Sequence, residues 1–451
     1  MQQHIFYHIY PLGLVGAPKT NTFDTKPATL LASLNPWLGH IQNLGFNALY
    51  LGPVFESSSH GYDTADYYEV DRRLGTNDCL RNFVAKAHAL DIKVILDGVF
   101  NHVGRDFKPF KDLQINRKKS RYKDWFSNVN FTKRSPFVDA FSYSGWNGHY
   151  QLVELNLKNP EVKQHLFGAV NQWIIDYEID GLRLDAADVL DFSFMQELSI
   201  FCKKRKTDFF LLGEVVQGDY NQWVNGKMLD SVTNYDCHTP FFESFNRADF
   251  DKIAFILDRQ FGPLGWYKEL SLYSFVDNHD VNRAASSLYK PEHLFPLYLL
   301  LFTLPGIPAV YYGSEWGFEG RKQKGSDSIL RPKVTFTNLV KLAKHPLLLD
   351  AIKRFIAIRK NNDVLGPGSY RQLKVLKEQF AFSRSYDDES LIIVVNASQN
   401  IETITIPLDE ISGEKFIDLL NPGFDCIAKN GILSLEIPSC WGRILKVDEK
   451  Q

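Results

Sequence analysis

The chain contains 451 residues, more than one ordinary domain holds, so two or three domains are expected. Its hydrophobic (44%) and charged (23%) fractions are typical of a globular protein with a large core. A net charge of −2 gives no support for nucleic acid or a membrane surface as a partner. The longest apolar run, Leu294–Leu304, also falls short of the roughly 20 residues that a membrane span needs.

The N-terminal segment and the cysteines bear on the cellular compartment. The first residues lack the positive charges and the long apolar stretch of a secretory signal, so a cytoplasmic location is expected. The 5 cysteines are odd in number, widely spaced and without a CxxC pair, which indicates reduced and mostly buried thiols.

From the N-terminus to about residue 360, short apolar runs alternate with amphipathic helical patterns, which is typical of an α/β fold. One helix is predicted from about residue 30 to Gly45. Another is predicted from about 160 to 177, with Asn159 as its cap and Pro160 in its first turn. The eight predicted strands are Ile5–Tyr10, Phe46–Leu51, Ile92–Leu96, Gly181–Leu184, Phe209–Leu212, Ser231–Tyr235, Leu272–Val276 and Pro308–Tyr311. This order predicts a parallel (β/α)₈ barrel.

Two segments do not fit the barrel. The third strand and the next helix are separated by about 55 residues, too many for a structureless loop. We therefore predict a barrel over residues 1–101 and 157–364 with an inserted domain over 102–156. The basic run of this insertion is interpreted as a solvated face, and its aromatic residues as either a small core or a wall for substrate. Alternating apolar residues after a Gly-Pro-Gly linker predict a C-terminal antiparallel β-sandwich over 365–451.

Four of the predicted strands deliver acidic residues at their C-terminal ends, the face on which barrel enzymes carry their active sites. The residues are Asp97, Asp185, Glu214 and the pair Asp277 and Asp280. Hydrolysis of a glycosidic bond with retention needs two carboxyl groups about 5–5.5 Å apart and with different pKa values.

Asp185 and Glu214 are candidates for these two groups. Arg183 lies two residues before Asp185 on one strand, so both side chains point the same way and the guanidinium keeps Asp185 ionised. Glu214 ends the next strand, and neighbouring strands lie about 4.8 Å apart. The alternative for Arg183 and Asp185 is a structural ion pair. Two Asn-His pairs, ending in His102 and His279, could donate to sugar hydroxyls, and Asp280 could accept from them.

Together these motifs resemble those of glycoside hydrolase family 13, the α-amylase family. The segments DGVFNH, GLRLD, LLGE and FVDNHD stand in the order of the four main family motifs. The resemblance implies Asp185 as nucleophile, Glu214 as general acid/base and Asp280 as transition-state stabiliser. It also implies that the sugar bound before the cleavage point is lined by Tyr62, His102, Arg183 and His279. Asp63 and Arg331 are expected to pair near that site.

The resemblance has departures that bear on calcium. Many α-amylases follow the nucleophile with Lys-His, and the carbonyl of that histidine helps to bind a structural calcium. Asp188 and Val189 stand at this place. A backbone carbonyl does not depend on the side chain, and Asn101 could be a further ligand. The inserted region shows no cluster of ligands, so no cofactor is expected to be required, and calcium is allowed but not favoured.

The motifs lean toward the cyclomaltodextrinase, neopullulanase and oligosaccharide-hydrolase branches, although no counterpart of the N-terminal domain common in cyclomaltodextrinases is seen. The expected function is cleavage of α-1,4-glucosidic bonds in maltooligosaccharides, maltodextrins or cyclodextrins. A transglycosylase or glucosyl isomerase would use the same covalent intermediate. A non-catalytic sugar-binding protein is a remote alternative because all three carboxylates are present. The sequence leaves the oligomeric state open.

Overall fold

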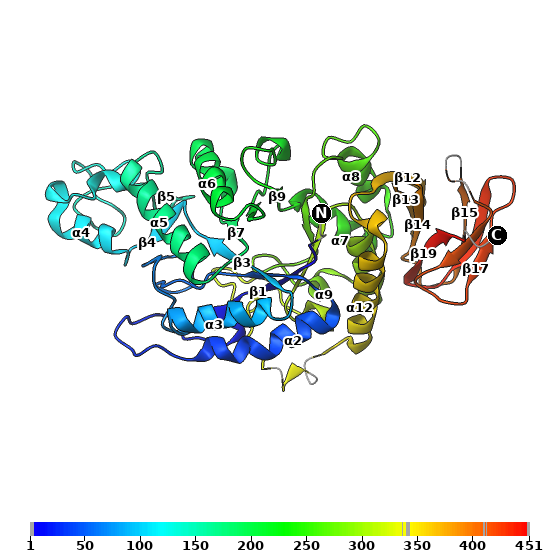
Figure 1. Cartoon of the computed structure of the whole chain (residues 1–451), viewed down its shortest axis with the longest axis horizontal. Coiled ribbons are helices and arrows are strands. Elements are labelled where there is room, and N and C mark those ends of the chain that lie inside the picture. The colour runs from blue at the N-terminus through cyan, green and yellow to red at the C-terminus, as the bar shows by residue number, and fades with distance from the viewer. Residues whose placement is uncertain (1–3, 336, 340–342, 409–410, 412, 449–451) are drawn as a thin grey trace.

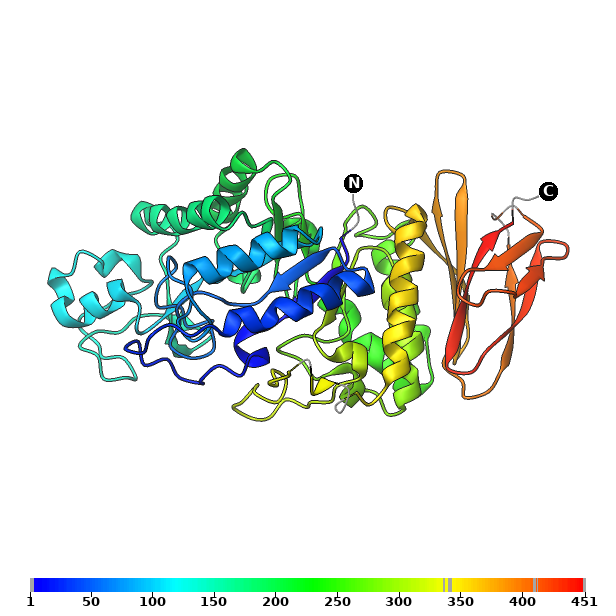
Figure 2. The same ribbon diagram turned by 60° about the horizontal axis from the view of Figure 1, so that its bottom comes forward.

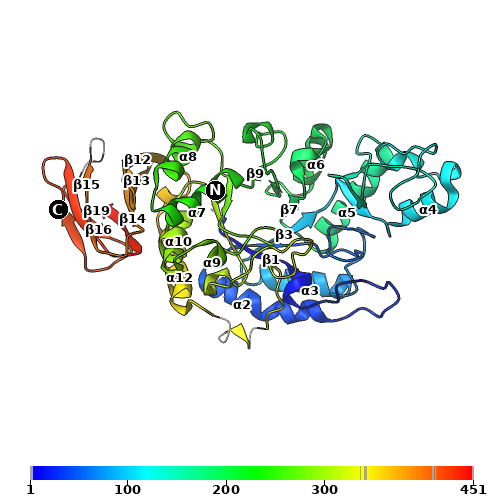
Figure 3. The ribbon, with the colours of Figure 1, turned by 180° about the vertical axis from the view of Figure 1, so that it is seen from behind.

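The structure is a computed structural model that describes residues 4–335, 337–339, 343–408, 411 and 413–448. It is elongated, with the barrel in the middle, the inserted segment at one end and the C-terminal strands at the other (Figure 1). The view from behind also shows the insertion and the C-terminal strands at opposite ends of the molecule, exchanged from left to right (Figure 3). None of the helices in the described ranges is long and apolar enough to cross a membrane. All five cysteines are free thiols.

Eight parallel strands form the central sheet in the order β10-β11-β1-β2-β3-β7-β8-β9. They are β1 (Phe6–Ile9), β2 (Ala48–Leu51), β3 (Lys93–Gly98), β7 (Gly181–Leu184), β8 (Phe210–Gly213), β9 (Ser231–Val232), β10 (Tyr273–Phe275) and β11 (Ile307–Tyr311). Asn234 N donates to Tyr273 O at 2.8 Å beside a parallel bridge between Thr233 and Tyr273, so the two edge strands also meet. The predicted barrel is confirmed. The predicted strand end at Tyr235 is wrong, because a helix begins at that residue.

The helices that cover the barrel are α2 (Asn35–Leu44), α3 (Asn77–His88), α5 (Pro160–Asp176), α6 (Phe192–Arg205), α7 (Tyr235–Arg247), α8 (Asp251–Phe261), α10 (Leu294–Thr303) and α12 (Pro346–Asn361). Two short helices are α1 (Pro11–Leu14) and α9 (Ala284–Ser287). The 3₁₀ turns are Leu30–Leu34, Arg117–Lys119, Lys123–Trp125, Ala187–Val189, Tyr220–Gln222, Pro291–His293, Ser314–Trp316 and Asp363–Leu365.

Two predicted helices can be checked at their ends. Asn159 caps α5 as predicted, since its side chain accepts from Glu161 N at 2.8 Å. The helix predicted from about residue 30 is divided into a 3₁₀ turn and α2. Pro36 lies in the first turn of α2, where its missing N–H is not needed. Gly45 ends this helix with a φ of 96°, a conformation that favours glycine.

The inserted segment is ordered around a small sheet, β4-β6-β5, and one helix. Its elements are β4 (His102–Gly104), α4 (Lys108–Asn116), β5 (Gly145–Trp146) and β6 (His149–Glu154). Phe141 and Tyr143 are buried against Phe110 of α4, which makes them a small core. Trp146 is only partly buried and lies beside the ring of His102. The small core is therefore confirmed for Phe141 and Tyr143, while a substrate wall stays a prediction for Trp146.

The C-terminal strands form a six-stranded antiparallel sheet, β12-β13-β14-β19-β16-β17, and a two-stranded sheet, β15-β18. Their bounds are β12 (Ser369–Val375), β13 (Gln379–Tyr386), β14 (Glu389–Asn396), β15 (Glu402–Pro407), β16 (Lys415–Asp418), β17 (Asp425–Ile427), β18 (Ile432–Ile437) and β19 (Trp441–Val447). Ile404, Ile406, Leu433 and Leu435 face the larger sheet and enclose a second core. The predicted antiparallel C-terminal fold is confirmed.

Arg384 of β13 ties this sheet to the barrel. Its guanidinium is fully buried and donates to the carbonyls of Thr303, at the end of α10, and of Gly366, Gly368 and Ser369. In Figure 2, α12 runs between the barrel and the C-terminal sheet. The guanidinium therefore supplies donors to buried carbonyls on both sides of this contact.

We expect Arg384→Leu to destabilise the protein by about 2–4 kcal/mol, because it leaves buried carbonyl oxygens without donors. The thermal midpoint, followed by circular dichroism, should fall by about 5 °C. Arg321→Leu is the matched control, since Arg321 is exposed, and should change stability by less than about 0.5 kcal/mol. Equal midpoints for the two variants would contradict the assignment.

Candidate active site

The guanidinium of Arg183 joins the carboxylates of three neighbouring strands. Nη1 donates to Asp97 Oδ1 at 2.9 Å and to Asp185 Oδ1 at 2.8 Å, and Nη2 lies 2.7 Å from Glu214 Oε2. Asp97 is the register partner of Arg183 on β3, while Glu214 directly follows β8. The strand period of two directs Arg183 and Asp185 to the same side, as predicted.

Burial sets the ionisation of this cluster. Burial raises the pKa of Glu214 above its ordinary value, although Arg183 opposes the rise. Burial also raises the pKa of Asp185 against the effect of Arg183, and the charges of Glu214 and Asp97 add to it. One cation cannot balance three buried carboxylates, so the Asp185–Glu214 pair keeps a proton more readily than free carboxyl groups do.

Asp280 has hydrogen-bond donors of its own. Arg331 Nη2 donates to its Oδ1 at 2.7 Å, and His279 Nε2 lies 2.9 Å from its Oδ2. Burial acts to raise the pKa of Asp280, but His279 and Arg331 hold it well below its ordinary value. Asp280 is therefore ionised under conditions in which the pair of Asp185 and Glu214 holds a proton.

Two tyrosines fix the floor of the site through Asp97. The hydroxyls of Tyr50 and Tyr62 donate to Asp97 Oδ2 at 2.7 and 3.0 Å. The ring of Tyr62 is nearly parallel to that of His279, at an angle of 8°, and its hydroxyl contacts His279 Nε2. Tyr50 was not among the predicted site residues, because within the strand it has the pattern of a core residue.

His102 faces the nucleophile candidate from the inserted segment. Its Nε2 lies 3.8 Å from Asp185 Oδ2 and has no hydrogen-bond partner among the described residues. Burial lowers the pKa of His102 to about 3, so the ring is neutral. Trp146 lies against it with ring centroids 5.5 Å apart. The sequence did not separate Trp146 from its buried aromatic neighbours.

The expected pair of Asp63 and Arg331 is wrong. Arg331 contacts Asp280 and stacks over the ring of Tyr10 at 4.5 Å. Asp63 instead accepts from the backbone N and the hydroxyl of Ser59. The two residues belong to loops that follow different strands, and the nearer carboxylate of Asp280 takes the guanidinium.

Asn101, one of the donors considered for calcium, contacts its neighbour His102. Asn101 turns its Nδ2 toward His102 Nδ1 at 3.3 Å, and its backbone carbonyl accepts from Leu155 N. Within the described ranges, no three His, Cys, Asp or Glu side chains are grouped to hold a metal ion.

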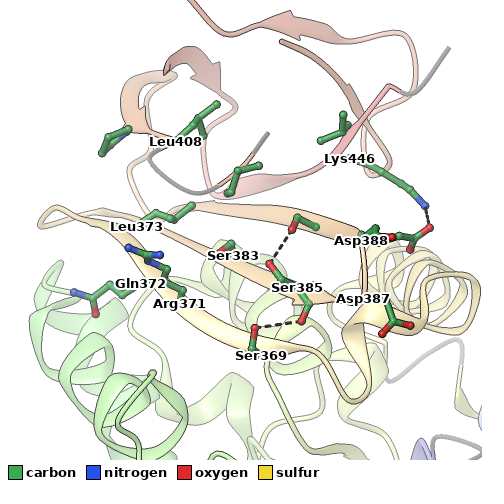
Figure 4. Close-up of a pocket in the computed structure, with 15 residues that line it drawn as sticks. Ser369, Arg371, Gln372, Leu373, Ser383, Ser385, Asp387, Asp388, Leu408 and Lys446 are labelled. Atoms are coloured by element: carbon green, nitrogen blue, oxygen red, sulfur yellow. Dashed lines mark hydrogen bonds and ion pairs between the residues drawn. The ribbon is translucent and has the colours of Figure 1, made fainter. Parts of the chain in front are cut away.

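A separate hollow of about 500 Å³ lies in the C-terminal domain between β12, β13 and the end of β15 (Figure 4). Serine hydroxyls line it, among them Ser385 and Ser390 at 2.8 Å, and Lys446 pairs with Glu389 at its rim. None of the barrel carboxylates reaches this hollow. The chemistry of the molecule is concentrated at the barrel mouth.

A (β/α)₈ barrel with carboxylates at the ends of its strands is typical of barrel enzymes. Comparison with known proteins identifies the family. Residues 31–344 match the family described as the catalytic domain of alpha amylase. The chain therefore belongs to the α-amylase family of glycoside hydrolases, whose members are glycosidases, and the predicted resemblance is confirmed.

Several relatives are similar over most of this chain. A cyclomaltodextrinase of Thermoanaerobacter pseudethanolicus is 33% identical over 84% of this chain, which spans 65% of that enzyme. Neopullulanase 2 of Thermoactinomyces vulgaris is 31% identical over 90% of this chain and 69% of its own length. A solved structure named cyclomaltodextrinase superposes with a TM-score of 0.85 at 28% identity, covering 98% of this chain and 78% of that one.

We expect Glu214→Gln to stabilise the protein at neutral pH. Because burial raises the Glu214 pKa, the folded state binds a proton that the unfolded state releases, and stability falls as pH rises from the ordinary glutamate pKa through the raised one. The variant should gain of the order of 1 kcal/mol at pH 8 and nothing at pH 4, measured by thermal unfolding at both values. A gain that is independent of pH would contradict the raised pKa.

Proposed function

We propose that this chain is a retaining glycoside hydrolase that cleaves α-1,4-glucosidic bonds in maltooligosaccharides, maltodextrins or cyclodextrins. The observation that carries the proposal is the single guanidinium of Arg183 between the carboxyl groups of Asp185 and Glu214. Retaining enzymes need two such groups about 5–5.5 Å apart. The names of the relatives, cyclomaltodextrinase and neopullulanase, support this class of substrate.

In the first step, a carboxylate oxygen of Asp185 attacks the anomeric carbon and forms a glucosyl ester. The glycosidic C–O bond breaks, and the proton held by Glu214 moves to the leaving oxygen. In the second step, Glu214 accepts a proton from water, whose oxygen attacks the anomeric carbon and releases the Asp185 carboxylate. Glu214 ends the cycle protonated and Asp185 ionised.

The other side chains hold the sugar and its charge. Asp280, kept ionised by Arg331, accepts from sugar hydroxyls, and these bonds strengthen as positive charge develops on the ring. The neutral ring of His102 donates to a hydroxyl beside Asp185 without adding a cation. Tyr62 offers its ring as a platform, and Trp146 extends this wall outward.

We also propose a cytoplasmic location, no requirement for calcium, and α-glucan oligosaccharides as the partner, with no role for nucleic acid. The location is supported by a relative from Bacillus subtilis named intracellular maltogenic amylase, which is 28% identical over 82% of this chain. The calcium proposal rests on the sequence of the inserted segment, which shows no cluster of ligands.

The first test is product analysis with maltoheptaose, a cyclodextrin, pullulan and trehalose, each with and without EDTA. We expect shorter maltooligosaccharides from the wild type, and a loss of at least about 10³-fold in rate for Asp185→Asn because no ester can form. Asp188→Asn is the matched control three residues further along the chain, in the 3₁₀ turn Ala187–Val189, and should stay active. Longer or isomerised products would favour transglycosylation, and equal activity of Asp185→Asn would refute the assignment.

A second test is the pH dependence of kcat/KM. The active form holds one proton on the pair of Asp185 and Glu214, so the profile should be a bell centred on mildly acidic to neutral pH. Both pKa values are raised by burial, which places both limbs above the range of free carboxyl groups. Glu214→Gln should lose the basic limb, and a monotonic wild-type profile would exclude a two-carboxylate mechanism.

A further inference from the structure

Two buried imidazole nitrogens below the candidate site have no hydrogen-bond partner among the described residues, His8 Nε2 and His279 Nδ1. Each side chain belongs to a residue that is 2% exposed. His8 lies on β1 and stacks on Tyr50 with ring centroids 4.2 Å apart. The rings of His8 and His279 are 5.1 Å apart and perpendicular, at 88°. His8 has no role in the chemistry described above.

The other nitrogen of His279 must carry a proton. Its Nε2 faces Asp280 Oδ2 at 2.9 Å and the hydroxyl oxygen of Tyr62. Tyr62 donates its only proton to Asp97, so toward His279 it can only accept. The carboxylate of Asp280 can also only accept. In the neutral imidazole, Nδ1 is then an acceptor, and it is buried without a partner next to the ring of His8.

We propose that His8 donates, through one buried water molecule, to Nδ1 of His279 and so holds this ring in its Nε2–H tautomer. Buried polar atoms are nearly always paired, and a water with polar neighbours is the ordinary means when two atoms are too far apart for direct contact. Burial lowers the pKa of His8 well below its ordinary value, so the ring is neutral and carries one N–H, which we place on Nε2. His8 is thus a positioning residue.

The tautomer matters because of Asp280. If the proton moved to Nδ1, the Nε2 lone pair of His279 would face the carboxylate oxygen at 2.9 Å, and both contacts of Nε2 would become repulsive. A donor at His8 makes the tautomer with the proton on Nδ1 less stable. The line of donors would run from His8 through His279 and Tyr62 to Asp97, which also binds Arg183.

The test combines nitrogen NMR of ¹⁵N-histidine-labelled full-length protein with kinetics. The His279 signals are assigned by their loss in His279→Gln. In the wild type, Nε2 should be protonated and Nδ1 unprotonated and hydrogen-bonded. His8→Leu should shift the Nδ1 signal and lower kcat/KM about 10- to 100-fold, the range seen when the partner that orients a functional histidine is removed. His8→Gln, whose carboxamide can donate, should restore both.

His165→Leu is the matched control, because His165 also has a buried Nε2 without a partner but lies on α5, outside the site. It should change neither the His279 signals nor kcat/KM. A protonated Nδ1 in the wild type, which needs no variant to fold, would overturn the proposal. So would an unchanged Nδ1 signal in His8→Leu, even with reduced activity. The kinetic part rests on the proposed function, whereas the NMR part stands if the protein cleaves no glucan.

Discussion

The site depends on one constraint, a single guanidinium facing three buried carboxylates. Arg183 contacts Asp97, Asp185 and Glu214, and all of them lie where water screens charge poorly. Such a cluster cannot reach neutrality by ion pairing alone. It must keep a proton, and a glycosidase needs that proton on one of two carboxyl groups. The proton that this chemistry requires therefore follows from the burial of the cluster, which raises the pKa of both Asp185 and Glu214.

The barrel makes this cluster possible because parallel strands in register deliver their ends to one place. Asp97 lies beside Arg183 in the β3–β7 register, and Leu212 lies beside it on the other side, two residues before Glu214. A shift of one residue in either pairing would turn a carboxylate out of the lumen. The register of these strands therefore determines which carboxylates face Arg183.

The sequence predicted what depends on local periodicity. All eight strands and the carboxylates at their ends follow from runs of β-prone residues, and Asn159 and Gly45 mark helix ends for local reasons. The prediction from sequence failed for the partner of Arg331, because that contact depends on how loops distant in sequence are placed. It also missed Tyr50 and His8, because a barrel strand buries polar and apolar residues alike and their spacing is that of core residues. Trp146 could be separated from Phe141 only by the position of the β5–β6 hairpin.

The other charged groups of the site explain why the proton stays on the pair of Asp185 and Glu214. Asp280 has Arg331 and His279 beside it, so it does not compete for a proton. His102 is neutral, so it adds no cation that would relieve Asp185. Each carboxylate outside the pair has its own donors, including the two tyrosine hydroxyls on Asp97. The pair of Asp185 and Glu214 shares the one cation of Arg183. Burial raises the pKa of both carboxyl groups, whereas that of Asp280 is lowered, so the proton stays on the pair.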